Sequence, residues 1–578
     1  MSTDTTRRAP LGGALPPGAA RALTAAGGLA TAAATFLSWT WTDDFPGDLT
    51  VSGYPGGLQV LTLAVGLLTL LYAAASYQPR GLRWLAPTGT TAALRLLALG
   101  AAATTWYTVI AIAWELGGLA NLDPGAWVAA VAVLLPLAGA FALPDDRRRA
   151  APAAPLASWA EILLIIAAFG IGLLVFTYGI DTAYGELFVG FLITVGFAAA
   201  ALLRSGLIRR VSDLTARYRP VATAAAFAAA AAFPFTQTSD EYTSVAANIL
   251  IFATVALGLN VVVGLAGLLD LGYVAFLGVG AYTAALVSGS VSSPWGVHFP
   301  FWAAALTGAA ASMIFGVLIG APTLRLRGDY LAIVTLGFGE IFRITMNNLD
   351  GTNGPHITNG SNGIPNIPDL VIFGFDFGQS HDVGGITLGR FSNYYLLMLL
   401  FTGIVVTVFA RSGNSRIGRA WVAIREDETA AGAMGINAFR LKLLAFALGA
   451  SLAGLAGTVQ AHVTYTVTPE QYQFAGSVPP NSAFLIAAVI LGGMGTISGP
   501  LVGASLLYLI PKKLAFLADY QLLLFGLALI LLMRLRPEGL IAGRRQQLEF
   551  HDADPATGSG ALNPDPRGST VGLTKAGA

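Results

Sequence analysis

Long apolar stretches recur along almost the whole chain, and this feature most limits what it can fold into. Most are about 20 residues long, the length with which an α-helix crosses about 30 Å of hydrocarbon. A helix also satisfies its own backbone hydrogen bonds, as the interior of a bilayer requires. Charged residues make up only 11% of the chain, against roughly 25% in soluble domains. The sequence therefore predicts an all-α, polytopic integral membrane protein.

We expect about sixteen membrane segments in two groups. The first group has about six, near 21–40, 57–77, 92–114, 124–144, 158–180 and 184–207. The second has about ten, near 220–235, 244–264, 271–288, 301–324, 330–347, 394–411, 443–462, 482–495, 498–511 and 519–536. Two Gly-rich interruptions, the first break around Gly264 and Gly267 and the second break at 492–500, predict discontinuous helices buried within protein.

Basic residues mark every second loop, and the loops between them are acidic or neutral. The basic loops include Arg80, Arg147 to Arg149 and Arg204. Because short Arg-rich loops stay in the cytoplasm, both termini are expected there. Arg7 and Arg8 before an Ala-rich run imitate a secretory signal. Its cleavage would leave an odd number of crossings and break the alternation, so we expect the segment to remain.

The composition divides the chain into four parts. Residues 1–20 and 542–578 are rich in Gly, Pro, Ala and charge, and are predicted to be disordered cytoplasmic tails. Residues 21–219 are predicted to form an N-terminal accessory bundle of about six spans, and 220–541 to form the core. The bundle shows no recognisable site, so a packing collar, a lipid-facing extension and a regulatory module all remain open.

A charged island, residues 416–436, separates two apolar spans and cannot lie in hydrocarbon. Its apolar residues, including Ile417, Trp421 and Met434, recur at helical spacing, which predicts a short amphipathic helix that ends at Gly435. Such a helix could pass force from a soluble partner to the membrane core. The alternative is an interfacial helix on lipid headgroups, which Trp421 would suit.

From about 220 to 541 the chain resembles the LivM-type permease subunit of bacterial branched-chain amino acid ABC importers. The resemblance rests on several separated motifs that stand in family order. They are Leu257–Gly264, Gly272–Phe276 with Gly278, Gly280, Ala281 and Tyr282, Gly328–Ile341, the island, Gly454–Gly457, Gly492–Thr496 and Arg536–Leu540. The bundle 21–219 exceeds what we associate with the family.

The resemblance implies a permease that imports branched-chain amino acids across the bacterial inner membrane. It implies four kinds of partner: a second related permease subunit, two ATP-binding subunits, an external solute-binding protein and the bilayer. No nucleic acid is implied. Urea, short amides and other hydrophobic amino acids remain open as substrates. An ion-coupled secondary transporter and a membrane-embedded sensor remain as alternatives from other classes.

The island resembles the family's cytoplasmic loop, which docks on the ATPase. Small residues would allow a close approach, and charged ones would set the orientation by complementary charge. The residues implied in coupling are Arg419, Arg425, Glu426, Asp427, Glu428, Ala430, Ala431 and Gly435.

Catalysis by this chain is not expected. A phosphate-binding P-loop needs a Gly-Lys pair, which the sequence lacks. ATP is therefore expected on the partner subunits, and no cofactor is expected here. The chain has no Cys, and its five His are scattered without ligand spacing, so no metal site is predicted.

The candidate translocation path consists of residues at the breaks and on the segment 330–347. Glu340 and Arg343 stand three residues apart on one helix and are predicted to pair, either to fix helices or to line the route. Asp270 could instead lie at the cytoplasmic interface, and the glycines could be packing residues. The candidates are Asn260, Asp270, Gly337, Glu340, Arg343, Gly492, Gly493 and Gly495.

The long polar loop 348–393 is predicted to lie outside the cell. It repeats Asn-Gly turn signals and then becomes apolar from Leu370 to Phe375, which predicts a small hairpin. This loop and 463–480 are candidate docking surfaces for the solute-binding protein, and a plain connector is the alternative.

Overall fold

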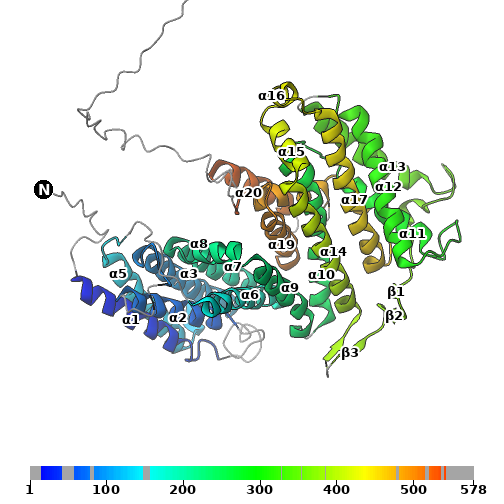
Figure 1. Ribbon diagram of the computed structural model, residues 1–578. Helices are drawn as coiled ribbons and strands as arrows, with labels where there is room; N and C mark the ends of the chain where they lie inside the picture. The colour runs from blue at the N-terminus through cyan, green and yellow to red at the C-terminus, as the bar shows by residue number, and fades with distance from the viewer. Residues whose placement is uncertain are drawn as a thin grey trace, which may run out of the picture.

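Two helical bodies make up the computed structural model, which we describe over residues 15–41, 57–77, 82, 84–146, 157–237, 239–326, 329–352, 354–383, 386–476, 481–514, 520–535 and 539–541. Helices α1 to α9 form one body, and α10 to α20 form the other (Figure 1). Helix α9, in the segment 220–235 predicted as part of the core, packs against α6 of the first body. The predictions for Arg147 to Arg149 and for the tail 542–578 lie outside the described residues.

The N-terminal bundle contains nine α-helices among the described residues. They are α1 (Pro17–Ala34), α2 (Leu58–Ser76), α3 (Thr91–Glu115), α4 (Pro124–Ala132), α5 (Leu134–Ala142), α6 (Ser158–Asp181), α7 (Gly185–Ser205), α8 (Leu207–Arg217) and α9 (Arg219–Ala232). Short 3-10 turns, η2 (Leu119–Asn121) and η3 (Phe233–Thr236), join some of them.

Prolines account for two differences from the predicted spans. Helix α1 begins at Pro17, inside the segment 1–20 that was predicted as a tail, because proline fits the first position of a helix. The predicted span 124–144 is divided into α4 and α5 at Val133. Pro136 lies just beyond this division and removes one backbone donor from the helical ladder.

The core begins with Ser239, whose hydroxyl caps α10 by accepting from the Glu241 amide (3.1 Å). Its helices are α10 (Asp240–Asn260), the π-turn η4 (Val261–Leu265), α11 (Val274–Val287), α12 (Phe301–Thr323), α13 (Asp329–Asn348), α14 (Arg390–Asn414), α15 (Arg416–Glu426), α16 (Glu428–Ala433), α17 (Ala438–Thr464), α18 (Ser482–Gly492), α19 (Ser498–Lys513) and α20 (Gln521–Leu535). The turns η5 (Gly360–Asn362) and η6 (Pro469–Tyr472) lie in its connections.

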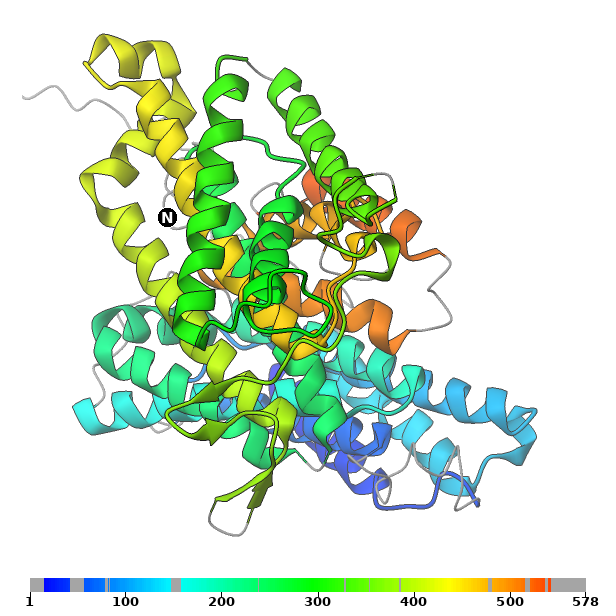
Figure 2. The same ribbon diagram turned by 90° about the vertical axis from the view of Figure 1, so that its right-hand side faces the viewer.

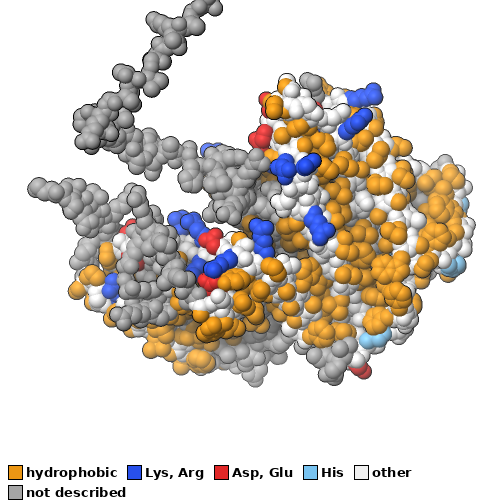
Figure 3. All heavy atoms as spheres, in the orientation of Figure 1, with side chains coloured by type: hydrophobic (Ala, Val, Ile, Leu, Met, Phe, Trp, Pro, Cys, Tyr) orange, Lys and Arg blue, Asp and Glu red, His pale blue; other side chains and the backbone are white. Residues whose placement is uncertain are grey.

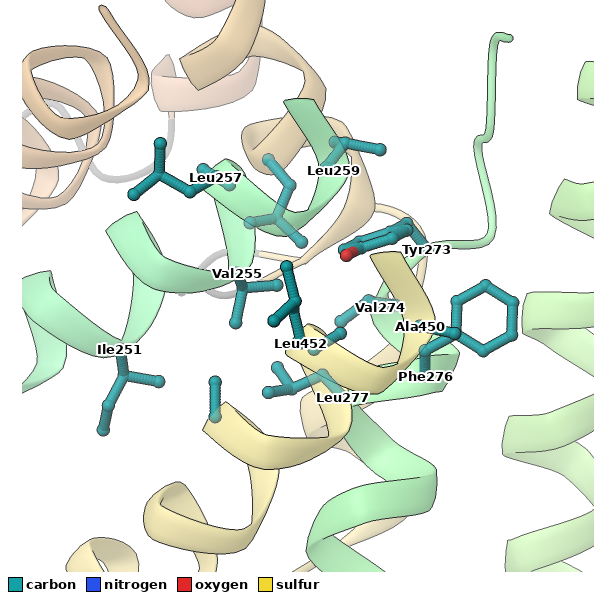
Figure 4. Packing of buried hydrophobic residues seen from close by; sticks show 14 of the residues in the cluster. Ile251, Val255, Leu257, Leu259, Tyr273, Val274, Phe276, Leu277, Ala450 and Leu452 are labelled. Carbon is teal, nitrogen blue, oxygen red and sulfur yellow. The ribbon is translucent and has the colours of Figure 1, made fainter. Parts of the chain in front are cut away.

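Helix α17 is central to the core, where it packs against α10, α11 and α12. Apolar side chains from α10, α11 and α17 meet in one buried cluster (Figure 4). Small residues bring the backbones close, since a Cβ at Gly280 would overlap Gly454 of α17. The Tyr273 hydroxyl donates to the carbonyl of Gly449 (2.6 Å), which satisfies a polar atom in this apolar interior.

Both Gly-rich interruptions are real breaks, as predicted. Helix α10 ends in the π-turn η4, and α11 starts only at Val274. Helix α18 ends at Gly492, and α19 starts at Ser498. Among the described residues, nine helical segments are long and apolar enough to cross a bilayer if α4 with α5, and α10 with η4, are each counted as one, and the half-helices α11 and α18 are shorter.

The polar loop and the island lie at opposite ends of the core (Figure 2). The loop contains two antiparallel hairpins, β1 (Val371–Ile372) with β2 (Phe375–Asp376) and β3 (His381–Val383) with β4 (Ile386–Leu388). The hairpin prediction for this loop is thus confirmed. Hydrophobic side chains cover most of the visible face of the core, while Lys and Arg gather toward the α15–α16 end and along the junction with the bundle (Figure 3).

Candidate functional site

The island is two short helices rather than the single helix predicted. Ser415 caps α15 by accepting from the Gly418 amide (3.1 Å). Asp427 has an extended backbone, and its carboxylate accepts from the amides of Thr429 (2.8 Å) and Ala430 (3.0 Å). A cap satisfies amides at the start of a new helix, so Asp427 ends α15 and begins α16. Gly435 has φ of 84° and follows α16, as the predicted stop requires.

One face of the island is fixed to α17. Trp421 is buried, and its indole donates to the carbonyl of Leu441 (2.7 Å). Glu428 forms an ion pair with Lys442 (2.7 Å). Trp421 therefore does not lie at a lipid surface, contrary to the interfacial alternative. Ala431, predicted as a docking contact, is also buried and belongs to this inner face.

The opposite face is open and carries most of the other predicted coupling residues. Arg419, Glu426 and Ala430 are exposed there. Met434, which was treated only as part of the helical pattern, is 83% exposed at the tip. Exposed methionine adapts well to a partner's groove. Because Ala431 is buried and Met434 is open, the surface available to a partner is shifted toward the end of α16.

Arg425 was predicted to face the partner, but its guanidinium turns inward. It donates to the carbonyl of Gly264 in η4 (2.8 Å) and contacts Glu426 (2.9 Å). Its aliphatic stem lies against Gly267, where a Cβ would overlap it. Gly267 also has φ of 71°. Both the close approach of Arg425 and the left-handed backbone therefore favour glycine at this position. The island thus contacts the first break directly.

The two breaks are joined by Asn260, which is fully buried at the end of α10. Its amide nitrogen donates to the carbonyl of Thr496 (2.7 Å), and its oxygen accepts from the Gly495 amide (2.8 Å). Gly264 approaches the same segment so closely that a Cβ would lie 2.6 Å from the Gly495 nitrogen. Asn260 therefore holds the second break against the first.

A cavity of about 460 Å³ opens beside these breaks. Gly495 and Ser498 from the second break line one side, and Gly413 and Asn414 from the end of α14 line another. Gly492 lies against Gly499, and Gly493 has φ of 122° next to Gly539. Asn260, Gly492, Gly493 and Gly495 are therefore brought together at one site, whereas the other predicted path residues are not.

Asp270 lies where the half-helices α11 and α18 begin. It is 1% exposed, so protein surrounds its side chain. Its carboxylate accepts from the Gly272 amide (3.0 Å) before α11. The amide of Val274 donates to the hydroxyl of Ser482 (3.1 Å), so the N-termini of the two half-helices meet. Such ends carry partial positive charge, which an acidic side chain stabilises.

Glu340 and Arg343 form the predicted pair on α13, with 2.9 Å between Oε2 and Nε. The pair is only partly buried and has partners that sequence reasoning missed. Arg343 also contacts Glu470 (3.3 Å), and the Phe474 amide donates to Glu340 (3.4 Å). Both partners belong to the segment 463–480. On the same helix, a Cβ added at Gly337 would meet no atom within 4 Å.

A second polar centre lies between the loop 348–393 and the segment 463–480 and was not predicted. The guanidinium of Arg390 contacts Asp369 (2.9 Å), donates to the carbonyl of His462 (2.8 Å) and lies 3.6 Å from the Tyr465 ring centroid. The Tyr465 hydroxyl donates to Asp369 (2.6 Å). Because Asp369 belongs to the loop 348–393 and Tyr465 to 463–480, the two candidate docking surfaces are one connected surface. Long-range pairing of this kind leaves no local sequence signal.

Comparisons with known proteins identify the relatives of this core. A family model described as a branched-chain amino acid transport system / permease component matches residues 242–533. The high-affinity branched-chain amino acid transport system permease protein LivM of Salmonella typhimurium is 40% identical over 338 residues, which cover 56% of this chain and 74% of the relative.

Two relatives from Escherichia coli extend this comparison. LivM is 40% identical over 335 residues, with 56% of this chain and 74% of the relative covered. The high-affinity branched-chain amino acid transport system permease protein LivH is 31% identical over 140 residues, which cover 24% of this chain and 43% of the relative. No solved structure matches significantly.

Proposed function

The chain belongs to the family of branched-chain amino acid transport permease components, and from that premise we propose that it imports branched-chain amino acids as one membrane subunit of an ATP-driven importer. The proposal adds a second related permease, two ATP-binding subunits and an external solute-binding protein. It places both termini in the cytoplasm. The family match carries the proposal, because it spans the breaks, the island and the outer loop together.

The geometry suggests how force would reach the transport route. An ATP-binding subunit docks on the open face of α15 and α16. Motion of α15 moves Arg425 and with it the Gly264 carbonyl of the first break. Asn260 then carries the displacement to Gly495 and Thr496 in the second break. Backbone breaks buried in protein are where membrane transporters commonly form their substrate sites.

At the outer end, the solute-binding protein docks on the surface formed by 348–393 and 463–480. Arg390 and Asp369 hold these segments together. The segment 463–480 also carries Glu470 and Phe474, which contact Arg343 and Glu340 on α13. Docking would therefore act on α13 through these contacts.

Transport in proteoliposomes tests the proposal. The full chain is purified with its companions, reconstituted with ATP on the cytoplasmic side, and supplied with its solute-binding protein and labelled leucine. Uptake that requires ATP hydrolysis and persists without an ion gradient is the expected result. Uptake driven by an ion gradient without ATP would contradict it. Labelled urea, accumulated in place of leucine, would contradict the substrate assignment alone.

A further inference from the structure

An open-sided cavity of about 530 Å³ lies between the N-terminal bundle and the core. Helices α6 and α9 form one wall, and α10, α14 and α19 form the other. At the outer end the rings of Phe176 and Phe233 pack together (5.5 Å), and Phe233 in turn meets Tyr395 of α14 (5.3 Å). The cavity therefore belongs to the junction of the two bodies, and Ile497 and Leu501 separate it from the cavity beside the breaks by lining both.

The walls are apolar, and most of their polar atoms are already used. The Tyr395 hydroxyl donates to the carbonyl of Ala230 (3.0 Å). The hydroxyls of Thr402 and Ser505 donate to carbonyls one turn earlier in their own helices (2.8 Å each). A water molecule needs two to four polar partners, which the described residues of these walls do not offer. An amino acid zwitterion would lose its hydration here without gaining hydrogen bonds in exchange. The occupant must therefore be apolar along most of its length.

The surroundings supply such an occupant. Helices α6, α10 and α14 are long and apolar enough to cross a bilayer. Next to the cavity, α6 exposes Ile171 (61%) and Leu174 (66%). A side chain exposed on a membrane span contacts acyl chains. An empty cavity would forfeit the dispersion contacts that such a chain provides.

Charge at the inner end selects the headgroup. Arg219 is the exposed first residue of α9. It stands one turn before the lining residues Ala222 and Thr223, hence on the same face of the helix. The neighbouring Arg217 is paired with Glu161 (3.3 Å), and no ion pair within the described part of the chain includes Arg219. This end therefore carries an excess positive charge.

We infer that the cavity binds one acyl chain of an anionic phospholipid whose phosphate lies beside Arg219. The site would give the N-terminal bundle a direct part in fixing lipid against α10, α14 and α19 of the core. Each wall contributes: the bundle supplies Arg219 and α6, and the core supplies the apolar floor.

Two glycines on α6 allow a matched test. Gly172 lines the cavity, and a Cβ there meets nothing within 4 Å, so Gly172→Leu places a side chain in open space. Gly170 also has open space at its Cβ but does not line the cavity. Gly170→Leu therefore adds the same side chain to the same helix outside the site. Arg219→Gln tests the headgroup contact.

The full chain is placed in nanodiscs that contain phosphatidylglycerol with a photoreactive diazirine near the end of one acyl chain. Crosslinked peptides are located by mass spectrometry. We expect labelling of α6, α9 and α14 in the wild type and in Gly170→Leu, and loss of that labelling in Gly172→Leu. Phosphatidylcholine that carries the same photoreactive acyl chain should label these helices less. Arg219→Gln should weaken the preference for phosphatidylglycerol over phosphatidylcholine about fivefold, which is the factor expected for one basic residue near an anionic headgroup.

Several outcomes would overturn the inference. Equal labelling in Gly172→Leu and Gly170→Leu, with both variants stable, would show that no chain enters the cavity. Equal labelling by the two lipids, unchanged in Arg219→Gln, would remove the headgroup contact. Competition by inorganic phosphate would indicate an anion site without a lipid chain. Labelling that disappears when the companion permease is bound would assign the cavity to that subunit.

Discussion

The guanidinium of Arg425 donates a hydrogen bond to the carbonyl oxygen of Gly264, 2.8 Å away, and so ties the island to the first break. Removing this contact in Arg425→Gln should lower ATP-driven uptake about tenfold, within the range of typical coupling energies. The ATP-binding subunits should still copurify, because the open face of α15 and α16 is unchanged. Arg411→Gln is the control, since Arg411 is an exposed arginine in the last turn of α14, outside the open face of the island. Equal uptake by both variants would contradict a role for this contact.

The exposed end of α16 should be the docking surface. Gly432 is exposed and has open space at its Cβ, so Gly432→Trp should block a partner without disturbing the fold. We expect normal expression but loss of the ATP-binding subunits on purification. Val291→Trp, at a 92% exposed position in the connection between α11 and α12, is the control. Ala431→Trp should instead reduce stability, because Ala431 is buried. Copurification of Gly432→Trp at the normal level would favour another docking site.

Glu340 and Arg343 should depend on each other, but modestly. Their side chains are 33% and 25% exposed, so the pair is worth about 1 kcal/mol at most. Thermal denaturation of Glu340→Gln, Arg343→Gln and the double variant forms a double-mutant cycle. We expect the double variant to lose less stability than the sum of the losses in the two single variants. Glu470→Gln should have a smaller effect, since Glu470 is 61% exposed. Strict additivity would show that the pair contributes nothing.

Lys513 should hold the N-terminal bundle against the core. Its ammonium donates to the carbonyl of Thr182 (2.7 Å) at the end of α6 and lies over the Tyr242 ring (5.1 Å) of α10. Lys513→Met would leave carbonyl groups without their donor, at a cost of about 2 kcal/mol. Limited proteolysis should then cut the junction faster. Lys512→Met is the control, because Lys512 is 48% exposed and 3.9 Å from Glu241. If both variants resist proteolysis equally, Lys513 does not hold the bundle against the core.

Asp146 should give the bundle a dependence on acid pH. Burial by itself raises the pKa of Asp146, but hydrogen bonds from Thr90 and Thr91 at the start of α3 outweigh it and leave the pKa below its usual value. The stabilisation is therefore present above about pH 4, the unfolded pKa, and is lost as the pH falls through the folded value. We expect the melting temperature to fall on acidification from about pH 6 to about pH 2.5, a range on both sides of that pKa. The fall should be less steep in Asp146→Asn than in the wild type. Parallel curves would contradict this.

Much of the architecture could be predicted because it depends on local pattern. Apolar runs of membrane length indicated the helices, and Gly-rich stretches indicated the two breaks. The pairing of Glu340 with Arg343 followed from a spacing of three residues on one helix. Gly435 ended the island as a left-handed residue should. Each inference needed residues within one or two turns of each other, and for such neighbours sequence spacing translates directly into geometry.

Only the tertiary structure decided which distant segments meet. Asn260 and Thr496 are 236 residues apart, and Arg425 and Gly264 are 161 apart. Helical periodicity shows that a face is apolar but not which helix covers it, so Ala431 looked available when α17 in fact buries that side of the island. The direction of Arg425 was equally undetermined, because a long side chain binds whichever carbonyl or carboxylate the packing brings near. These choices arise from the packing of separate helices, a property of the folded chain that no local spacing contains.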